Sequence, residues 1–425
     1  MTSAAEAQQL LREGRVQEAE KAFQAVLEAD PEHLEALNVA GLIALRDGAT
    51  MRALGLLNRA AARHASDPMT HHHLGLAHEA GGDLPSAIAS QRQAVQLAPE
   101  FHVARLHLGR LLKQAQEPTA AAIQYARALQ DAQQQGHWLN SETTPASLRV
   151  SVEHAVQHVR AHRHAAFSEL LAPLRARYGP EALRRVEACL SVHLNEASPQ
   201  YADARQQPSF LYFPGLPASA YLDRALFPWL AALEAHTAPI RAELLALLPS
   251  DRGRERVFTT DELEQANLRG LDQPPSWNGY YFYRHGERRE DNCAACPVTA
   301  AALGQLPLAG IRAHGPEALF SVFTPGTHLL PHRGVTNTRL VGHLPLMVPE
   351  DCALKVGGEL HQWQEGQVVI FDDTYEHEAW NRSDKTRVVM IFDIWNPYLS
   401  EAERSAITDL IPAMGDFREA VESTH

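Results

Sequence analysis

Residues 363–397, WQEGQVVIFDDTYEHEAWNRSDKTRVVMIFDIWNP, decide the fold of the C-terminal part of this chain. Short runs rich in Val, Ile, Phe and Trp alternate here with polar segments that contain Gly, Asn, Asp and Ser. Such alternation predicts short antiparallel strands joined by hairpins. The same texture starts near residue 317, with the runs ALFSVF, THLL, RLVGHLPLMV and CALKV. At least about six short strands within roughly 80 residues predict a jelly-roll, cupin-like barrel, that is, a double-stranded β-helix.

Three polar residues stand out in this strand pattern. His332 follows the first pair of strands, His377 comes 45 residues later, and Arg387 opens an apolar strand ten residues after that. A cation at the head of an apolar strand is costly unless it meets an anion. Two imidazoles suit Fe(II), and a guanidinium suits the far carboxylate of 2-oxoglutarate. The order therefore favours a 2-oxoglutarate-dependent iron oxygenase.

One expected ligand of such a site is missing from the sequence. The usual iron triad of these oxygenases contains a carboxylate two residues after the first histidine. The segment PHRGVTNTRL has Gly334 at that position. The residues alone leave two interpretations of His332 open, an incomplete metal site or an ordinary histidine at a strand end.

The segments PHRGVTNTRLVGHLPLMVP and 363–397 resemble the aspartyl/asparaginyl β-hydroxylases, and the resemblance extends over about residues 206–400. Members of that family hold iron with two histidines and no protein carboxylate, which agrees with Gly334. The resemblance implies that His332 and His377 are the iron ligands. It also implies that Arg387 and Ser321 bind the distal carboxylate of 2-oxoglutarate, with His343 in contact with this cosubstrate near the metal.

The activity that this resemblance implies is that of a 2-oxoglutarate- and Fe(II)-dependent dioxygenase. Such an enzyme consumes O2, hydroxylates a C–H of an aspartyl- or asparaginyl-like residue in a peptide, protein or carrier-bound substrate, and releases succinate and CO2. Arg339 stands where the family also has arginine. The vertebrate enzymes have a second arginine two residues later, where this chain has Val341. The residues thus favour the oxygenase core more than an aspartyl substrate.

The N-terminal third repeats with a period of 34 residues, which is seen in Ala19, Ala53, Ala87 and Ala121 and again in Gly41, Gly75 and Gly109. Small residues at fixed positions allow paired antiparallel helices to approach closely. The period resembles that of tetratricopeptide repeats, which implies an all-α solenoid with a groove for a peptide or protein partner. We expect about four repeats over residues 1–133, a helical linker region over 134–205 and the oxygenase domain over 206–425.

Composition limits the other functions. A formal net charge of -13 argues against binding to nucleic acid. No apolar run approaches the roughly 18 residues of a membrane span, and the first residues, MTSAAEAQQLLREG, lack the features of a secretory signal. These observations predict a cytoplasmic protein.

For other groups of His and Cys residues we expect an ordinary structural role and not a metal site. The run HHH at 71–73 lies on a repeat helix, where neighbours point in different directions, and His154, His158 and His162 form a helical stripe. We expect solvent-exposed faces for both. Cys293 and Cys296 lack the second pair that a zinc site needs, and a loop pair is expected there. Near His377, the three acidic residues Asp372, Asp373 and Glu376 either fix its imidazole or solvate a turn.

Several alternatives remain compatible with the residues. One is a non-catalytic binding protein in which a repeat scaffold is fused to a cupin-like barrel. Another is a hydroxylase of a lipid or small molecule, since lipid A hydroxylases belong to the same superfamily. Halogenation at an open iron position and a cupin-type isomerase are further possibilities, and the isomerase gives no reason for Arg387.

Overall fold

The computed structural model describes residues 4–249, 253–258, 266–269 and 277–423. The chain divides into two compact units. The first contains residues 1–166 together with 415–425, and the second contains residues 167–414. We call them the repeat unit and the sheet unit.

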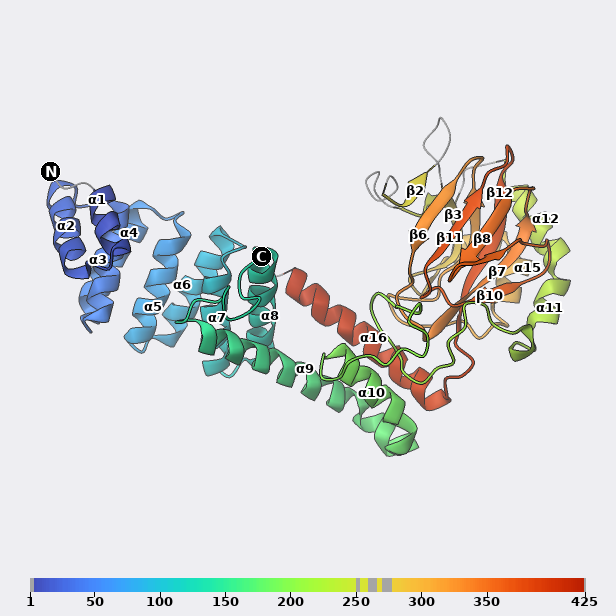
Figure 1. Ribbon diagram of the computed structural model, residues 1–425, viewed down its shortest axis with the longest axis horizontal. Helices are drawn as coiled ribbons and strands as arrows, with labels where there is room; N and C mark the ends of the chain where they lie inside the picture. The colour runs from blue at the N-terminus through green and yellow to red at the C-terminus, as the bar shows by residue number, and fades with distance from the viewer. Residues whose placement is uncertain (1–3, 250–252, 259–265, 270–276, 424–425) are drawn as a thin grey trace. The chain divides into compact units, whose positions relative to one another are not determined.

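The repeat unit is a succession of antiparallel helix pairs (Figure 1). A ninth helix, α9 (Arg149–Tyr178), begins in this unit and continues past its boundary. The eight helices of the repeats are α1 (Ala4–Arg12), α2 (Val16–Ala29), α3 (Leu34–Arg46), α4 (Thr50–Arg63), α5 (Pro68–Ala80), α6 (Leu84–Leu97), α7 (His102–Gln114) and α8 (Pro118–Gln134).

The repeated small residues explain how these helices approach one another. The four periodic alanines are fully buried. A Cβ atom on Gly41 would lie 2.7 Å from Leu57 Cγ, and one on Gly109 would lie 2.7 Å from Tyr125 Cδ1. In both cases the glycine of the first helix makes room for a side chain of the second. The expectation of close helix packing is confirmed.

The prediction for the histidine run at 71–73 is wrong. His72 and His73 are buried, at 6% and 9% exposure. His72 Nδ1 lies 2.9 Å from Gln91 Oε1, and His73 Nδ1 lies 3.0 Å from Asn38 Oδ1. Helix α5 is enclosed by its neighbours on two sides, so consecutive residues can both be buried. Burial lowers the pKa of His73 to about 4, which keeps it neutral.

Two antiparallel sheets form the sheet unit. The described strands of the first sheet are, in spatial order, β1 (Arg254–Arg256), β3 (Trp277–Arg284), β5 (Ala318–Phe323), β12 (Arg387–Trp395), β7 (Arg339–Met347) and β10 (Val369–Phe371), with β4 (Glu287–Arg288) beside β3. Those of the second are β2 (Leu268–Arg269), β6 (His328–His332), β11 (His377–Asn381), β8 (Cys352–Val356) and β9 (Glu359–His361). Every apolar run singled out in the sequence forms a strand.

One hydrophobic cluster joins the two sheets, and we call the face of each sheet that contributes to it the inner face. Phe323, Val341 and Val389 come from the first sheet, whereas Leu354 and Ala379 come from the second. Side chains alternate along a strand, so Arg387 shares the inner face with Val389. By the same alternation, His343 shares it with Val341.

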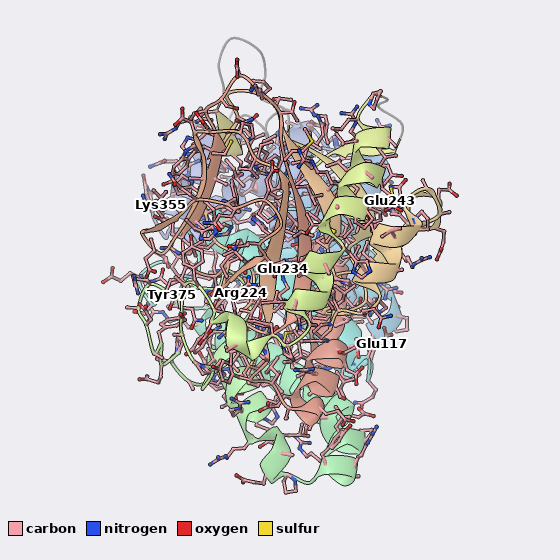
Figure 2. All side chains as sticks on the ribbon, turned by 90° about the vertical axis from the view of Figure 1, so that its right-hand side faces the viewer. Glu117, Arg224, Glu234, Glu243, Lys355 and Tyr375 are labelled. Atoms are coloured by element: carbon pink, nitrogen blue, oxygen red, sulfur yellow. The ribbon has the colours of Figure 1, made fainter. Side chains whose placement is uncertain are left out.

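Helices cover the outer face of the first sheet (Figure 1). Carboxylates fix two of them (Figure 2): Glu243 accepts hydrogen bonds from the backbone N–H groups of Val298 and Thr299, and Glu234 accepts one from Val368. The covering helices are α11 (Leu230–Ala235), α12 (Thr237–Leu247), α14 (Glu290–Ala295) and α15 (Pro297–Leu303). Helices α10 (Arg184–His193) and α16 (Glu401–Glu422) complete the longer helices of the described chain.

The cysteine pair belongs to these helices, so the expected loop is wrong. Cys293 lies in α14 and Cys296 lies between α14 and α15. Both are free thiols in the hydrophobic cluster under the helices, and burial raises the pKa of Cys296 to about 12. No helix among the described residues is long and apolar enough to cross a membrane.

Candidate active site

His332 and His377 face each other across two neighbouring strands. They are register partners in the β6–β11 pair, and their ring centroids lie 4.0 Å apart. His332 Nδ1 lies 2.8 Å from the Leu330 carbonyl oxygen, and His377 Nδ1 lies 3.0 Å from that of Tyr375. A carbonyl only accepts hydrogen bonds, so each Nδ1 carries the proton and each Nε2 carries the lone pair. The pair can therefore offer two imidazole nitrogens to one metal ion.

The structure explains why Gly334 cannot be an acidic residue. A Cβ atom at this position would lie 2.1 Å from Cγ of Asp373. The carboxylate of Asp373 thus fills the space in which a side chain at 334 would start. The backbone reinforces the contact, because the Gly334 N–H donates to the Asp373 carbonyl over 2.6 Å. Among the described residues, no group of three or more His, Cys, Asp or Glu side chains is arranged to hold a metal.

Arg339 connects this region to the adjacent strand. It pairs with Asp373 at 3.3 Å and with Asp393 of β12 at 2.6 Å. Burial raises the pKa of both carboxyl groups, and Arg339 opposes that rise. The guanidinium is thereby engaged by two carboxylates of the protein itself, and its role here is to hold Asp373 beside Gly334.

The three acidic residues near His377 have separate roles. Asp372 accepts hydrogen bonds from the backbone and hydroxyl of Thr374 and from Gln206, which fixes a turn. Asp373 occupies the space beside Gly334. Glu376 pairs with Arg333 at 3.6 Å on the exposed side. None of these contacts is a hydrogen bond to the His377 imidazole.

Arg387 is a buried cation that meets no anion in the part of the chain that the structure describes. It is 1% exposed, and among the described residues no carboxylate forms an ion pair with it. Its Nη1 donates to Ser321 Oγ over 3.3 Å, whereas its Nε has no hydrogen-bond partner. The guanidinium carbon lies 3.9 Å from the centroid of the Phe323 ring and 4.6 Å from that of Trp363. Burial lowers the pKa of Arg387 to about 9.

Other buried polar atoms near Arg387 also lack partners. They are His343 Nδ1 and Trp363 Nε1, whose rings lie 5.9 Å apart. Ser321 Oγ accepts a hydrogen bond from Trp277 Nε1 over 2.9 Å. Burial, and then Arg387, lowers the pKa of His343 well below its usual value, so this imidazole is neutral. Such unmet donors and acceptors in one place fit a polar ligand.

Phe371 connects the histidine pair to these groups. Its ring centroid lies 5.7 Å from that of His377 and 5.0 Å from that of His343. The structure thus brings His332, His377, His343, Arg387 and Ser321 into one region of the sheet unit. Sequence reasoning missed Trp363 and Trp277. Trp363 opens the segment 363–397, whereas Trp277 lies outside the strand pattern predicted from residue 317 onward, so no local signal identified it.

Both parts of the chain have matches among known proteins. The family model described as aspartyl/asparaginyl beta-hydroxylase matches residues 234–397, and the tetratricopeptide repeat model matches residues 4–68, 50–100 and 72–137. Among solved structures, MamA from Desulfovibrio magneticus RS-1 is 26% identical with a TM-score of 0.29, covering 31% of this chain and 75% of that one.

Curated relatives match a little under half of the chain. The ornithine lipid ester-linked acyl 2-hydroxylase of Rhizobium tropici is 40% identical over 183 residues, which are 42% of this chain and 62% of that protein. The human aspartyl/asparaginyl beta-hydroxylase is 34% identical over 177 residues, 41% of this chain and 22% of that protein. The chain therefore spans less than two thirds of each. Residues 234–397 are thus similar to the aspartyl/asparaginyl β-hydroxylases, and they follow residues that match tetratricopeptide repeats.

Proposed function

We propose that the chain is a 2-oxoglutarate- and Fe(II)-dependent dioxygenase whose two sheets form a double-stranded β-helix. The observation that carries the proposal is Arg387, a buried guanidinium that has an unpaired Nε and no carboxylate partner among the described residues. A buried cation of this kind is destabilising unless a ligand supplies the anion. The far carboxylate of 2-oxoglutarate is such an anion, and a guanidinium can bind it through two hydrogen bonds.

Different residues would bind the iron and the 2-oxoglutarate. His332 and His377 would hold Fe(II) through their Nε2 atoms, because both Nδ1 protons are given to backbone carbonyls. Bound iron with 2-oxoglutarate and O2 supplies the oxidising power for hydroxylation of a C–H bond. Ser321, which is fixed by Trp277, supports Arg387 at the distal carboxylate. The aromatic rings of Phe323 and Trp363 exclude water from the guanidinium.

The substrate that we propose first is an aspartyl- or asparaginyl-like residue of a peptide, protein or carrier-bound molecule. The repeats support this choice, since such arrays bind protein partners. A lipid acyl chain is the second candidate. It is favoured by the relative from Rhizobium tropici and by the buried, apolar Val341 on the inner face, where the vertebrate enzymes have a second arginine.

Binding of the cosubstrate can be tested without knowledge of the substrate. Addition of 2-oxoglutarate with Mn(II) in place of iron should raise the melting temperature of the wild type. The increase should vanish in Arg387→Ala and persist in His314→Ala, an exposed control. An increase that survives in Arg387→Ala would refute the assigned role of this arginine and reopen the isomerase alternative.

Turnover separates an enzyme from a binding scaffold. We expect succinate formation with Fe(II), ascorbate and 2-oxoglutarate, including turnover uncoupled from substrate, in the wild type and none above background in His377→Ala. Background succinate from both proteins, even with acidic peptides or acyl lipids present, would favour the non-catalytic alternative. Mass spectrometry for a gain of one oxygen then distinguishes peptide from lipid.

A further inference from the structure

Asn381 is a fully buried polar residue at the end of β11, and its side chain joins the two sheets. Its Nδ2 donates to the carbonyl oxygens of Phe323 and Thr324, at the end of β5, over 3.2 and 3.1 Å. A third acceptor, the carbonyl oxygen of Lys385, lies at 2.7 Å in the turn that follows β11. One amide of the second sheet thus ties the end of β5 to the turn that leads into β12.

The oxygen of the same amide is also engaged. Oδ1 accepts hydrogen bonds from the backbone N–H and the hydroxyl of Ser383 over 3.2 and 2.7 Å, and from the Cys352 thiol of β8 over 3.1 Å. An amide side chain offers two N–H donors and two lone pairs, and here both ends have partners within the protein. Asn381 therefore holds other groups in place rather than binding a ligand itself.

The groups that this amide holds are those that place Arg387. Lys385 precedes Arg387 by two residues, and Phe323 is its register partner in the β5–β12 pair. The Phe323 ring also lies 3.9 Å from the guanidinium carbon. The guanidinium itself has few contacts, since Nη1 donates to Ser321 Oγ over 3.3 Å and Nε has no hydrogen-bond partner among the described residues. The position of Arg387 therefore depends on where β12 begins, and Asn381 fixes that point.

We propose, on the basis of the function proposed above, that Asn381 is a positioning residue that presents Arg387 to the distal carboxylate of 2-oxoglutarate. Paired hydrogen bonds from a guanidinium to a carboxylate depend on the relative orientation of the two groups. A cation that is ordered before binding also loses less entropy when the ligand arrives. Without the amide, the turn 382–386 would lose its tie to β5. Arg387 could then shift towards water, where an unpaired cation is more stable.

Calorimetric titration of the Mn(II)-loaded full chain with two 2-oxo acids tests the proposal. The acid 2-oxobutyrate offers a metal the same keto-acid group as 2-oxoglutarate but has no distal carboxylate. Asn381→Ala should bind 2-oxoglutarate about tenfold more weakly than the wild type does. Its affinities for Mn(II) and for 2-oxobutyrate should not change, because only the site of the distal carboxylate is disturbed.

Asn396→Ala is the matched control. Asn396 directly follows the other end of β12 and is 2% exposed, and its Nδ2 donates to the Asn337 carbonyl over 3.1 Å. Both substitutions remove a buried amide, so we expect similar losses of stability in urea unfolding. Only Asn381→Ala should lose affinity for 2-oxoglutarate. Hydrogen exchange of residues 381–387 without any ligand should likewise be faster in Asn381→Ala than in Asn396→Ala or the wild type.

A milder variant serves if Asn381→Ala does not fold. Ser383→Ala removes one donor to the amide oxygen, and affinity for 2-oxoglutarate should fall about twofold to threefold. Unchanged affinity in the variants of Asn381 and Ser383, or an equal loss with both 2-oxo acids, would overturn the positioning role alone. A wild type that does not bind 2-oxoglutarate with Mn(II) would refute the proposed function, and the positioning role with it.

Discussion

Histidines are clustered in both units, and the comparison shows what separates a packing residue from a ligand candidate. In the repeat unit, His72 and His73 each contact a neutral amide oxygen. The His72 ring lies against Phe101 and His107, and the His73 ring lies against His72. In the sheet unit, His332 and His377 direct Nδ1 at backbone carbonyls and face each other. The first arrangement uses the imidazole as part of a core, and the second leaves Nε2 for a metal.

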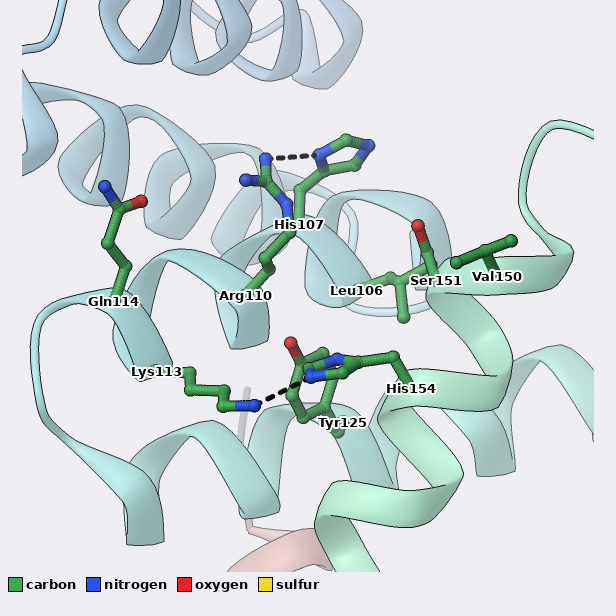
Figure 3. Close-up of a pocket in the computed structure, with 9 residues that line it drawn as sticks. All are labelled: Leu106, His107, Arg110, Lys113, Gln114, Tyr125, Val150, Ser151 and His154. Atoms are coloured by element: carbon green, nitrogen blue, oxygen red, sulfur yellow. Dashed lines mark hydrogen bonds between the residues drawn. The ribbon is translucent and has the colours of Figure 1, made fainter.

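The hydrogen-bond partner of a histidine thus says more about its role than the presence of the histidine does. A carbonyl partner fixes the proton on Nδ1, whereas an amide side chain can rotate to suit either tautomer. The stripe of His154, His158 and His162 lies between these cases. His154 and His158 pack edge-on against Tyr125, and neighbouring rings of the stripe are stacked. His154, which Figure 3 shows beside Tyr125, is exposed, whereas His158 and His162 are half-buried, so the exposed face that we predicted is found only in part.

The largest effect is expected from Gly334→Asp, which would restore the carboxylate of an ordinary iron triad. The new Cβ would overlap Asp373 and place a second negative charge in a buried space. We expect a loss of stability of about 3 kcal/mol or more, together with loss of succinate formation.

Thermal and urea unfolding measure this effect. Gly310→Ala is a suitable control, because a Cβ at that position would meet no atom within 4 Å. A Gly334→Asp protein as stable as the wild type would show that Asp373 can move away. The claim that Asp373 leaves no room for a side chain at position 334 would then be wrong.

Two alanine substitutions test whether the two pairs of histidines differ in function. His73→Ala removes the partner of Asn38 and leaves a small cavity, so we expect a loss of about 1–3 kcal/mol and unchanged Mn(II) binding. His377→Ala should do the reverse, with Mn(II) affinity at least about tenfold lower and a loss of only about 1 kcal/mol. Calorimetric titration and urea unfolding report the two quantities, and equal Mn(II) binding by both variants would contradict the assignment.

The elements of the fold were largely predictable, because alternation of apolar residues and a fixed repeat period are local signals. His332, His377 and Arg387 were found by their order along predicted strands. The contact between Asp373 and Gly334 was not predictable, since it depends on how the turn after β10 lies against the turn after β6. The burial of His72 and His73 was missed because helix α5 is enclosed on two sides, which a single helical period does not reveal.

Acid should destabilise the repeat unit through its buried histidines. Burial lowers the pKa of His73 and His107 to about 4, against about 6.5 in an unfolded chain. Between these values the unfolded state binds more protons, so stability is complete above pH 6.5 and is lost as the pH falls towards 4. We expect a decrease of about 1–3 kcal/mol over this window.

Hydrogen exchange of peptides from α5 and α7 at several pH values measures this loss. His107→Phe retains an aromatic ring but removes one titrating group, and its exchange should depend less on pH. The same pH dependence in wild type and variant would show that His107 does not carry the effect.

Ser321→Ala gives the smallest expected effect and tests how much the Ser321 hydroxyl contributes to the affinity for 2-oxoglutarate. The hydroxyl accepts from Trp277 and from Arg387, so its removal leaves two buried donors with one acceptor fewer. We expect affinity for 2-oxoglutarate to fall about fivefold to tenfold, with no change in exchange of the repeat helices. Ser321→Cys should retain part of the affinity that Ser321→Ala loses, because a thiol is a weak acceptor of similar size. If the Ser321→Ala protein binds 2-oxoglutarate as tightly as the wild type does, then Arg387 is oriented by the rings of Phe323 and Trp363 rather than by this hydroxyl.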